Sequence, residues 1–199
     1  MSLLIPFGKP REDFTFLTPL TAVAVSNAIE KLTETDPKIK WVNDVYLNGK
    51  KICGILTEIV NGSEPETVDS IVIGIGINIS TASFPSGLEG KAGAIMSGIS
   101  RREISQREIS RRDVSRSALA AETVNELLDK NNREKNYILT QYRNRAYLTG
   151  KTITFSKNGV LSTAFVEGID DNCGLMIRTE DGKTAVLTSG EVSVCGIEQ

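Results

Sequence analysis

The sequence predicts an α/β protein in which a mixed β-sheet with helices precedes a small domain of short strands. Up to Gly150, β-branched runs alternate with segments that carry a helical stripe of apolar residues. After Gly150, five short strands separated by tight turns are typical of a small barrel. A hydrophobic content of 40% in 199 residues is enough for a core in one medium and one small domain.

The first elements are a short strand and a helix. Ser2–Phe7 is an apolar run that ends at glycine and proline, which favours a strand. Thr18–Pro19 then opens a helix, because proline suits the first turn, and Asp36–Pro37 ends it. Leu20, Val23, Ala24, Ala28 and Leu32 give this segment a helical stripe of apolar residues.

A run of strands follows the helix. Ile39–Val42 and Val45–Leu47 are expected to be brief strands, and Lys51–Val60 is the strand that returns from the second one. Asn48–Gly49 is a strong signal for a hairpin turn between them. Val68–Ile79 is apolar and β-branched enough for a central strand of the sheet.

Residues 99–116 repeat a motif of five residues, ISRRE, ISQRE, ISRRD and VSRS. Because this period matches neither helix nor strand, we expect an insertion in a solvated loop. Six arginines against three acids leave a contact with phosphate or an acidic partner open. Ser117 is expected to cap the next helix, and a second helix covers Glu134–Tyr147. The inward residues of the first are expected to be Leu119, Ala120, Val124, Leu127 and Leu128.

After Gly150 the sequence changes to short apolar runs separated by turn residues. The expected strands are Lys151–Phe155, Ser162–Ile169, Gly174–Arg178, Thr184–Leu187 and Glu191–Cys195. We therefore predict one domain over residues 1–148, which includes the repeat, and a second domain over residues 149–199.

Composition excludes several classes of function. The formal charge of −2 gives no global attraction to nucleic acid or to an anionic membrane. The absence of histidine removes the commonest general base and metal ligand. The three cysteines form no C-x-x-C pair and favour a reducing compartment. With no signal peptide and no apolar run of membrane-spanning length, we expect a cytoplasmic protein.

Three clusters on neighbouring predicted strands have residues suited to chemistry: Lys40–Asp44, Lys50–Leu56 and Gly74–Asn78. Lys51 opens an apolar strand and can bring a mobile positive charge to the edge of a site. Gly54, three residues later, leaves room for a ligand at the strand backbone.

The remaining members of these clusters extend the same site. Gly74 and Gly76 allow a close approach to the next strand, and Asn43 and Asn78 each supply a donor and an acceptor. Asp44 at a strand end can orient or deprotonate an amine. Together these residues suit a site that activates an acid, in which a carboxylate attacks a phosphate group and charge builds up in the transition state. Taken singly, each is ordinary: a solvated lysine, strand bulges and a turn pair. No P-loop and no dinucleotide fingerprint is present.

The combination is more specific than its parts. K-W-V-N-D, K-K-I-C-G-I-L-T-E and I-V-I-G-I-G-I-N, in this order and spacing, resemble the biotin protein ligase family. G-E-V-S at Gly190–Ser193 resembles the signature of that family's small C-terminal barrel. The resemblance implies a class II synthetase-like catalytic domain followed by an SH3-like barrel. It covers most of the chain apart from the repeat.

The resemblance also implies an activity and its residues. Such enzymes use ATP to convert biotin into biotinyl-adenylate and then transfer biotin to one lysine of a carboxylase's biotin carboxyl carrier domain. Lys51 would neutralise the carboxylate and the phosphate, and Asp44 would lie near the acceptor lysine. The biotin pocket would be lined by Lys51, Gly54, Leu56 and Gly74. Asn43 and Asn78 would contact the adenylate, and Mg²⁺ would accompany ATP without a metal site of protein ligands alone.

The sequence departs from the family pattern in three places. Val42 stands where the family usually has proline, an exchange we expect to be tolerated because valine suits a strand. The repeat fills a loop that is normally shorter. No segment matches the family's Gly/Arg-rich biotin loop, and none matches the DNA-binding helix-turn-helix of some members, so we expect impaired activity and no DNA binding.

Other functions stay open at this level. A lipoate ligase shares the fold, although Trp41–Asp44 and Gly190–Ser193 argue against it. A protein that binds biotin, adenylate or the carrier domain without catalysis is a second alternative, and an inactive fragment is a third. A homodimer is also expected, through an exposed edge at Leu56–Val72.

Overall fold

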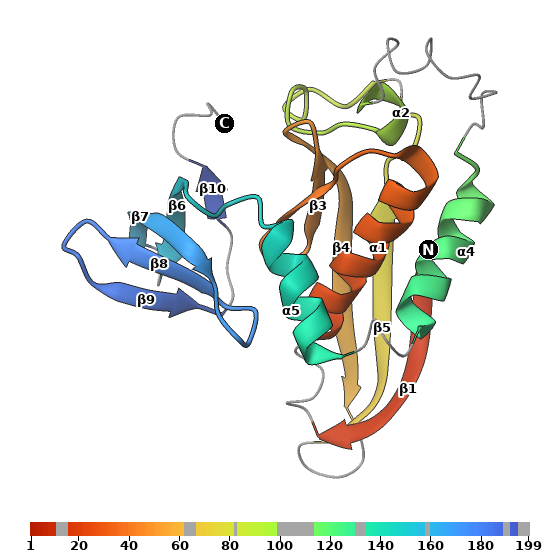
Figure 1. The fold of residues 1–199 in the computed structure, drawn as a ribbon, viewed down its shortest axis with the longest axis horizontal. Helices are drawn as coiled ribbons and strands as arrows, with labels where there is room; N and C mark the ends of the chain where they lie inside the picture. The colour runs from red at the N-terminus through yellow and green to blue at the C-terminus, as the bar shows by residue number, and fades with distance from the viewer. Residues whose placement is uncertain are drawn as a thin grey trace.

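The computed structural model describes residues 1–10, 16–61, 67–81, 83–98, 114–129, 134–157, 160–188 and 192–194. The described elements form two five-stranded sheets with helices beside the first sheet (Figure 1). The repeat lies outside these residues up to position 113, and its last residue, Arg116, begins a helix.

The first sheet has the order β1-β5-β4-β3-β2. Its strands are β1 (Ser2–Pro10), β2 (Lys38–Lys40), β3 (Asp44–Leu47), β4 (Lys50–Asn61) and β5 (Thr67–Ile77). The α/β class is confirmed. The strand pairs described in this sheet are all antiparallel, so parallel pairing, which a mixed sheet implies, is confined to two isolated bridges, Ile39 with Ala146 and Lys51 with Ala92.

The strand pairing tests one prediction in part. Val72 of β5 pairs with Leu4 of β1 and with Glu58 of β4, so it has a neighbouring strand on both sides. Leu56 of β4 pairs with Gly74 of β5, whereas the pairing of β4 with β3 ends at Gly54, so the described strands give Leu56 no partner on its second side. A homodimer through this part of β4 stays a prediction.

The two faces of the first sheet differ in burial. The core face is covered by helices and contains buried residues from every strand of the sheet except β1: Ile39, Val45, Leu47, Cys53, Ile55, Ile71, Ile73 and Ile75. The opposite, open face exposes Leu4, Leu56 and Val60. Side chains alternate between the faces of a strand, so paired residues such as Asp44 and Gly54 share the open face.

The described helices of at least ten residues are α1 (Leu17–Thr33), α4 (Arg116–Leu128) and α5 (Lys135–Asn144), and they lie on one side of the sheet (Figure 1). A short helix, α2 (Ile95–Gly98), follows a loop. Two details of the predicted helices are wrong. The N-cap of α4 is Ser115 rather than Ser117, and its hydroxyl accepts from the Ala118 N–H at 2.9 Å. Leu128 is 62% exposed, because one residue along an α-helix turns the side chain by about 100°, away from the core that Leu127 faces.

The predicted strand Ile39–Val42 is also corrected. β2 ends at Lys40, and Trp41, Val42 and Asn43 form the turn that leads into β3. Val42 therefore lies in a turn, so the reason given for tolerating valine here, that it suits a strand, does not apply. The Trp41–Val42 peptide bond is cis. By contrast, the hairpin turn is confirmed, since Asn48 and Gly49 both have positive φ between β3 and β4.

The second sheet has the order β10-β6-β7-β8-β9, and its strand pairs are antiparallel throughout the described residues. All five predicted strands are confirmed as β6 (Thr152–Lys157), β7 (Val160–Ile169), β8 (Leu175–Thr179), β9 (Thr184–Leu187) and β10 (Val192–Val194). Helix α5 lies between the two sheets (Figure 1).

Within the described part of the chain, no helix is both long and apolar enough to cross a membrane.

Candidate functional site

A β-bulge in the β3–β4 hairpin determines which side chains meet. Leu47 pairs with Lys50 and Tyr46 with Lys51, but Val45 pairs with Cys53, so Ile52 is the extra residue on β4. In a regular strand, Lys51 and Gly54 would lie on opposite faces, because they are three residues apart. The bulge turns Lys51 to the open face that carries Asp44 and Gly54.

The two charged residues predicted for catalysis form an ion pair. Lys51 Nζ lies 2.7 Å from Asp44 Oδ1, with the lysine side chain 45% exposed and the aspartate side chain 17% exposed. Oδ1 itself is buried and has no partner in hydrogen-bond geometry among the described residues, so the nearby ammonium charge is its compensation. The pair thus joins a largely buried acceptor to a cation that still reaches solvent.

The predicted glycines form a flat floor beside this ion pair. Gly54 pairs with Gly76, and Leu56 pairs with Gly74, all on the open face. A Cβ atom at Gly54 would lie 3.4 Å from Lys51 Cε and Nζ, and one at Gly74 would lie no closer than 3.7 Å to Leu56. Neither Gly54, Gly74 nor Gly76 has positive φ. Since neither backbone conformation nor internal packing demands glycine here, these residues leave the surface free for something that approaches it.

Leu56 gives the floor an apolar border. Its side chain is 58% exposed, although the residue lies on a central strand of the sheet. Leu56 therefore lies on the open face of the sheet together with Gly54 and Gly74. A cavity of about 410 Å³ lies next to β5 and α4, lined among others by Ile75, Ile77 and Leu119, and none of the predicted site residues lines it.

The two asparagines lie on either side of β4. Asn43 Nδ2 donates to the Ile55 carbonyl at 2.7 Å, and the Ile55 N–H donates back to the Asn43 carbonyl at 3.0 Å. Asn78 follows β5, where its N–H donates to the Ile52 carbonyl and its carbonyl accepts from Ile95 N–H. Asn43 therefore uses a side-chain N–H to hold the fold, and its Oδ1 takes no part in that hydrogen bond.

Sequence reasoning missed the segment that supports the bulge. Lys51 N–H donates to the Lys91 carbonyl and Gly93 N–H donates to the Lys51 carbonyl, both at 2.8 Å. A Cβ atom at Gly93 would lie 2.8 Å from Lys50 Cβ, so this position requires glycine. The sequence signal that could have revealed this contact is Gly93. It lies just before a helix and has no positive φ, so a turn does not explain the glycine.

Burial and the Asp44 charge affect the groups around the site. Burial, with a smaller contribution from Asp44, raises the pKa of the Cys53 thiol to about 12. The same two causes, in the same order, raise the pKa of Tyr46, whose ring stacks on Tyr147 at 5.0 Å between centroids. Cys53 is therefore a protonated core residue and not a nucleophile. No cluster of three or more His, Cys, Asp or Glu side chains that could hold a metal occurs in the described residues.

Known proteins share this fold and these segments. Residues 2–78 match the Biotin/lipoate A/B protein ligase family, and residues 149–194 match the biotin protein ligase C terminal domain. The fold and the first match define the class, a protein ligase of the biotin or lipoate type. Because the second match is to a domain of biotin protein ligases, and the two matches together span more than half of the chain, the chain belongs to the biotin protein ligase family.

Individual relatives agree with this assignment. The bifunctional ligase/repressor BirA of Bacillus spizizenii is 44% identical over 91 residues, 45% of this chain and 27% of the relative. The biotin–[acetyl-CoA-carboxylase] ligase of Paracoccus denitrificans is 32% identical over 158 residues, 77% of this chain and 61% of the relative. The chain thus spans less than two thirds of the length of these relatives.

Solved structures show the same fold. The apo biotin protein ligase of Aquifex aeolicus has a TM-score of 0.69 at 23% identity, with 97% of this chain and 81% of that chain covered. The Aquifex aeolicus enzyme in complex with biotin and ATP has a TM-score of 0.66 at 24% identity, with 97% and 78% covered. The predicted combination of an α/β domain and a small C-terminal barrel is therefore confirmed at the level of the fold.

Proposed function

We propose that the chain catalyses biotin protein ligation: ATP-dependent formation of biotinyl-adenylate, followed by transfer of biotin to a lysine of a carrier domain. The observation that carries the proposal is the Lys51–Asp44 pair beside the glycine floor of the open face. It joins a cation, a buried carboxylate and an apolar surface at one place. The membership of the chain in the biotin protein ligase family supports it.

Lys51 suits the first half-reaction. In that step a biotin carboxylate oxygen attacks the α-phosphorus of ATP, and pyrophosphate leaves. Two anionic groups must approach each other, and a half-exposed ammonium on a rigid strand can reduce their repulsion. Because the bulge fixes the direction of the side chain, the charge is presented without a large loss of conformational entropy.

The floor suits biotin. The bicyclic ring and its aliphatic chain offer apolar surface that can lie on Gly54 and Gly74, with Leu56 as a side wall. Burial of the exposed part of Leu56 under a ligand would add roughly 1–2 kcal/mol of favourable transfer free energy. A side chain at either glycine would occupy the space that the ligand needs.

Asp44 suits the second half-reaction. The acceptor amine attacks the acyl carbonyl of the adenylate, AMP leaves, and the amine gives up a proton. Asp44 already holds one ammonium group at 2.7 Å, so its carboxylate can attract the ammonium of an acceptor lysine and take its proton. Oδ1 of Asn43 and the amide of Asn78, on the two sides of β4, are proposed to contact the adenylate.

Magnesium enters this scheme as part of the substrate, complexed with ATP. In that form the ion would be held mainly by the phosphate oxygens and by water. The partner is the biotin carboxyl carrier domain of a carboxylase. The cytoplasmic location and the absence of DNA binding stay predictions.

The test is biotin-dependent exchange of pyrophosphate into ATP. Wild-type protein should catalyse exchange, and Lys51→Ala should abolish it. Lys50→Ala, which removes an exposed ammonium at the preceding residue, should retain it. No exchange at high protein concentration would contradict the proposal, and undiminished exchange in Lys51→Ala would contradict the role of that lysine.

A competition experiment separates biotin from lipoate. The two acids are offered together with ATP, and the adenylates are quantified. The match of residues 149–194 to the biotin protein ligase C-terminal domain favours biotinyl-adenylate as the main product. Predominant lipoyl-adenylate would assign the chain to the lipoate branch of the wider family.

A further inference from the structure

The turn formed by Trp41, Val42 and Asn43 directly precedes Asp44, and other parts of the molecule hold it from three sides. We propose that Trp41 and Tyr142 are positioning residues, through which a loop of the C-terminal sheet and helix α5 fix the catalytic location of Asn43 and Asp44. The inference rests on the proposed function, since it concerns the same site. It adds a role for parts of the chain that lie far from that site in sequence.

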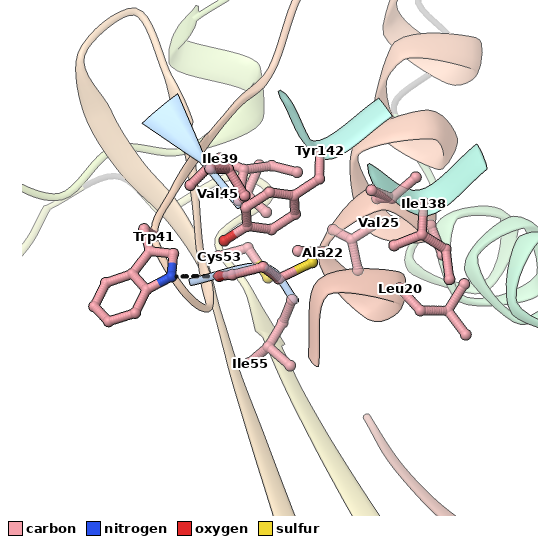
Figure 2. Packing of buried hydrophobic residues seen from close by; sticks show 14 of the residues in the cluster. Leu20, Ala22, Val25, Ile39, Trp41, Val45, Cys53, Ile55, Ile138 and Tyr142 are labelled. Carbon is pink, nitrogen blue, oxygen red and sulfur yellow. Dashed lines mark hydrogen bonds between the residues drawn. The ribbon is translucent and has the colours of Figure 1, made fainter. Parts of the chain in front are cut away.

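The first anchor comes from the C-terminal sheet. Trp41 Nε1 donates a hydrogen bond of 2.8 Å to the carbonyl of Cys173, and both residues are buried (Figure 2). An indole N–H in such a place must find an acceptor, because an unmade hydrogen bond there would cost the desolvation of the group. The acceptor is offered by a loop 132 residues further along the chain.

The second anchor comes from α5. Tyr142 Oη donates to the Val42 carbonyl at 3.0 Å. Its ring is fully buried among core residues, some of which Figure 2 shows around it. Burial, followed by the nearby Cys173 and Asp44, raises the pKa of this phenol well above its ordinary value. The hydroxyl therefore stays protonated and remains a donor to the turn.

Helix α5 also holds the loop that anchors the indole. Arg143, next to Tyr142, donates from Nε to the Ile169 carbonyl at 2.9 Å and forms an ion pair with Asp171 at 2.7 Å. Two consecutive residues of one helix thus contact the turn and the loop respectively. The turn, the helix and the loop form one connected unit.

The loop is itself rigidly shaped. Asp170 Oδ1 accepts from the N–H groups of Asn172 and Gly174, at 2.8 and 2.7 Å. A Cβ atom at Gly174, the residue before β8, would lie 2.4 Å from a methyl group of Val186, so any side chain there would require Val186 to move. These contacts fix the direction of the Cys173 carbonyl, whose residue has a φ of 62°.

The third contact links the turn to the floor. Asn43 Nδ2 donates to the Ile55 carbonyl, next to Gly54. Movement of Trp41 and Val42 would be passed to Asn43 and Asp44, because they follow within three residues. Displacement of catalytic groups by about 1 Å can cost a large factor in rate.

Tyr142→Phe tests the inference by removing one hydroxyl. Trp41 is the only tryptophan of the chain, so its fluorescence reports on the turn without any assay of activity. We expect emission at longer wavelength, stronger quenching by acrylamide, and a kcat for pyrophosphate exchange that falls about five- to tenfold. The KM for biotin should change less than about twofold, because the floor is not altered. Tyr137→Phe is the matched control: it removes an α5 hydroxyl that contacts Asn27 instead of the turn.

The contribution of the C-terminal loop is tested separately. Asp170→Ala removes the acceptor that shapes the loop and should change Trp41 fluorescence and kcat in the same direction as Tyr142→Phe. Asp170→Asn keeps an Oδ1 acceptor and should restore both. Asp181→Ala disturbs the β8–β9 turn, where Asp181 contacts Thr179 and Lys183, and should change neither.

The outcomes separate the two proposals. Unaltered fluorescence and kcat in Tyr142→Phe and Asp170→Ala would overturn the inference, as would altered fluorescence with unaltered kcat. Absence of exchange in the wild-type chain would refute the proposed function instead, and the fluorescence of the variants would still confirm or overturn the anchoring of the turn.

Discussion

The Lys51–Asp44 pair allows the structural and catalytic roles of one lysine to be separated. Lys51→Met keeps the length of the side chain and removes its charge. At 2.7 Å, two unit charges attract by about 6 kcal/mol at an effective dielectric constant of about 20, and by about 1.5 kcal/mol in bulk water. Because the lysine side chain is 45% exposed, the true value lies near the lower limit. We expect Lys51→Met to reduce the free energy of unfolding by about 1–2 kcal/mol, since it leaves Asp44 Oδ1 buried without a counter-charge.

The double variant Lys51→Met with Asp44→Asn should regain most of that stability, because a neutral amide no longer needs the ammonium group. Asp44→Asn alone should cost less than Lys51→Met, since a half-exposed ammonium group can turn to water. Urea denaturation of all four proteins gives the coupling energy of the pair. Pyrophosphate exchange should fall by about 10²–10³ in both variants that lack Lys51.

The two measurements can refute the reasoning independently. Restored exchange in the double variant would mean that Lys51 acts only by neutralising Asp44. A Lys51→Met variant as stable as wild type would mean that Asp44 is compensated by water or by a residue outside the described ones. Lys50→Met serves as the control, because it removes an exposed charge from the adjacent residue and should alter neither quantity.

Three further predictions concern the floor, the bulge and the thiols. Gly74→Ala should leave the melting temperature unchanged, because its Cβ meets nothing closer than 3.7 Å, yet weaken biotin binding measured by calorimetry. Gly93→Ala places a Cβ 2.8 Å from Lys50 and should lower both stability and pyrophosphate exchange, which a comparison of melting curves with kcat will check. With pKa values raised by burial to about 12, Cys53 and Cys173 should resist Ellman's reagent at pH 8 until the protein unfolds, measured in a variant without the third cysteine. Their contribution to stability is complete below the ordinary pKa of 9.0 and is lost as the pH rises toward about 12, so unfolding titrations should show falling stability over that range.

Much of the fold follows from local chemistry. Asn48 and Gly49 predict the turn, because both residue types tolerate positive φ. The strands on both sides of the turn have the apolar content of a buried sheet. The five short strands after Gly150 are equally local. The class of the protein and the proximity of Asp44 to β4 could therefore be predicted from the sequence.

The face on which Lys51 lies could not be predicted in this way. A two-residue turn with regular pairing would place Asp44 opposite Cys53 and would direct Lys51 and Gly54 to opposite faces. The bulge at Ile52 changes both relations, and it is supported by contacts with Lys91–Gly93, about forty residues away. A bulge without a glycine or proline of its own leaves no local signal.

Long-range contacts limited the other predictions as well. Trp41 and Val42 have the composition of a strand, but the indole donates to the Cys173 carbonyl and the Val42 carbonyl accepts from Tyr142, so both residues belong to a turn. A local sequence pattern does not reveal that a helix and a loop far along the chain both contact the same turn. The contacts also make a physical demand on the fold: a C-terminal sheet that only covered surface would not need a buried hydrogen bond to the turn before Asp44. That bond joins the loop before β8 to the turn that directly precedes Asp44, and this connection is the physical basis of the role proposed for the C-terminal sheet.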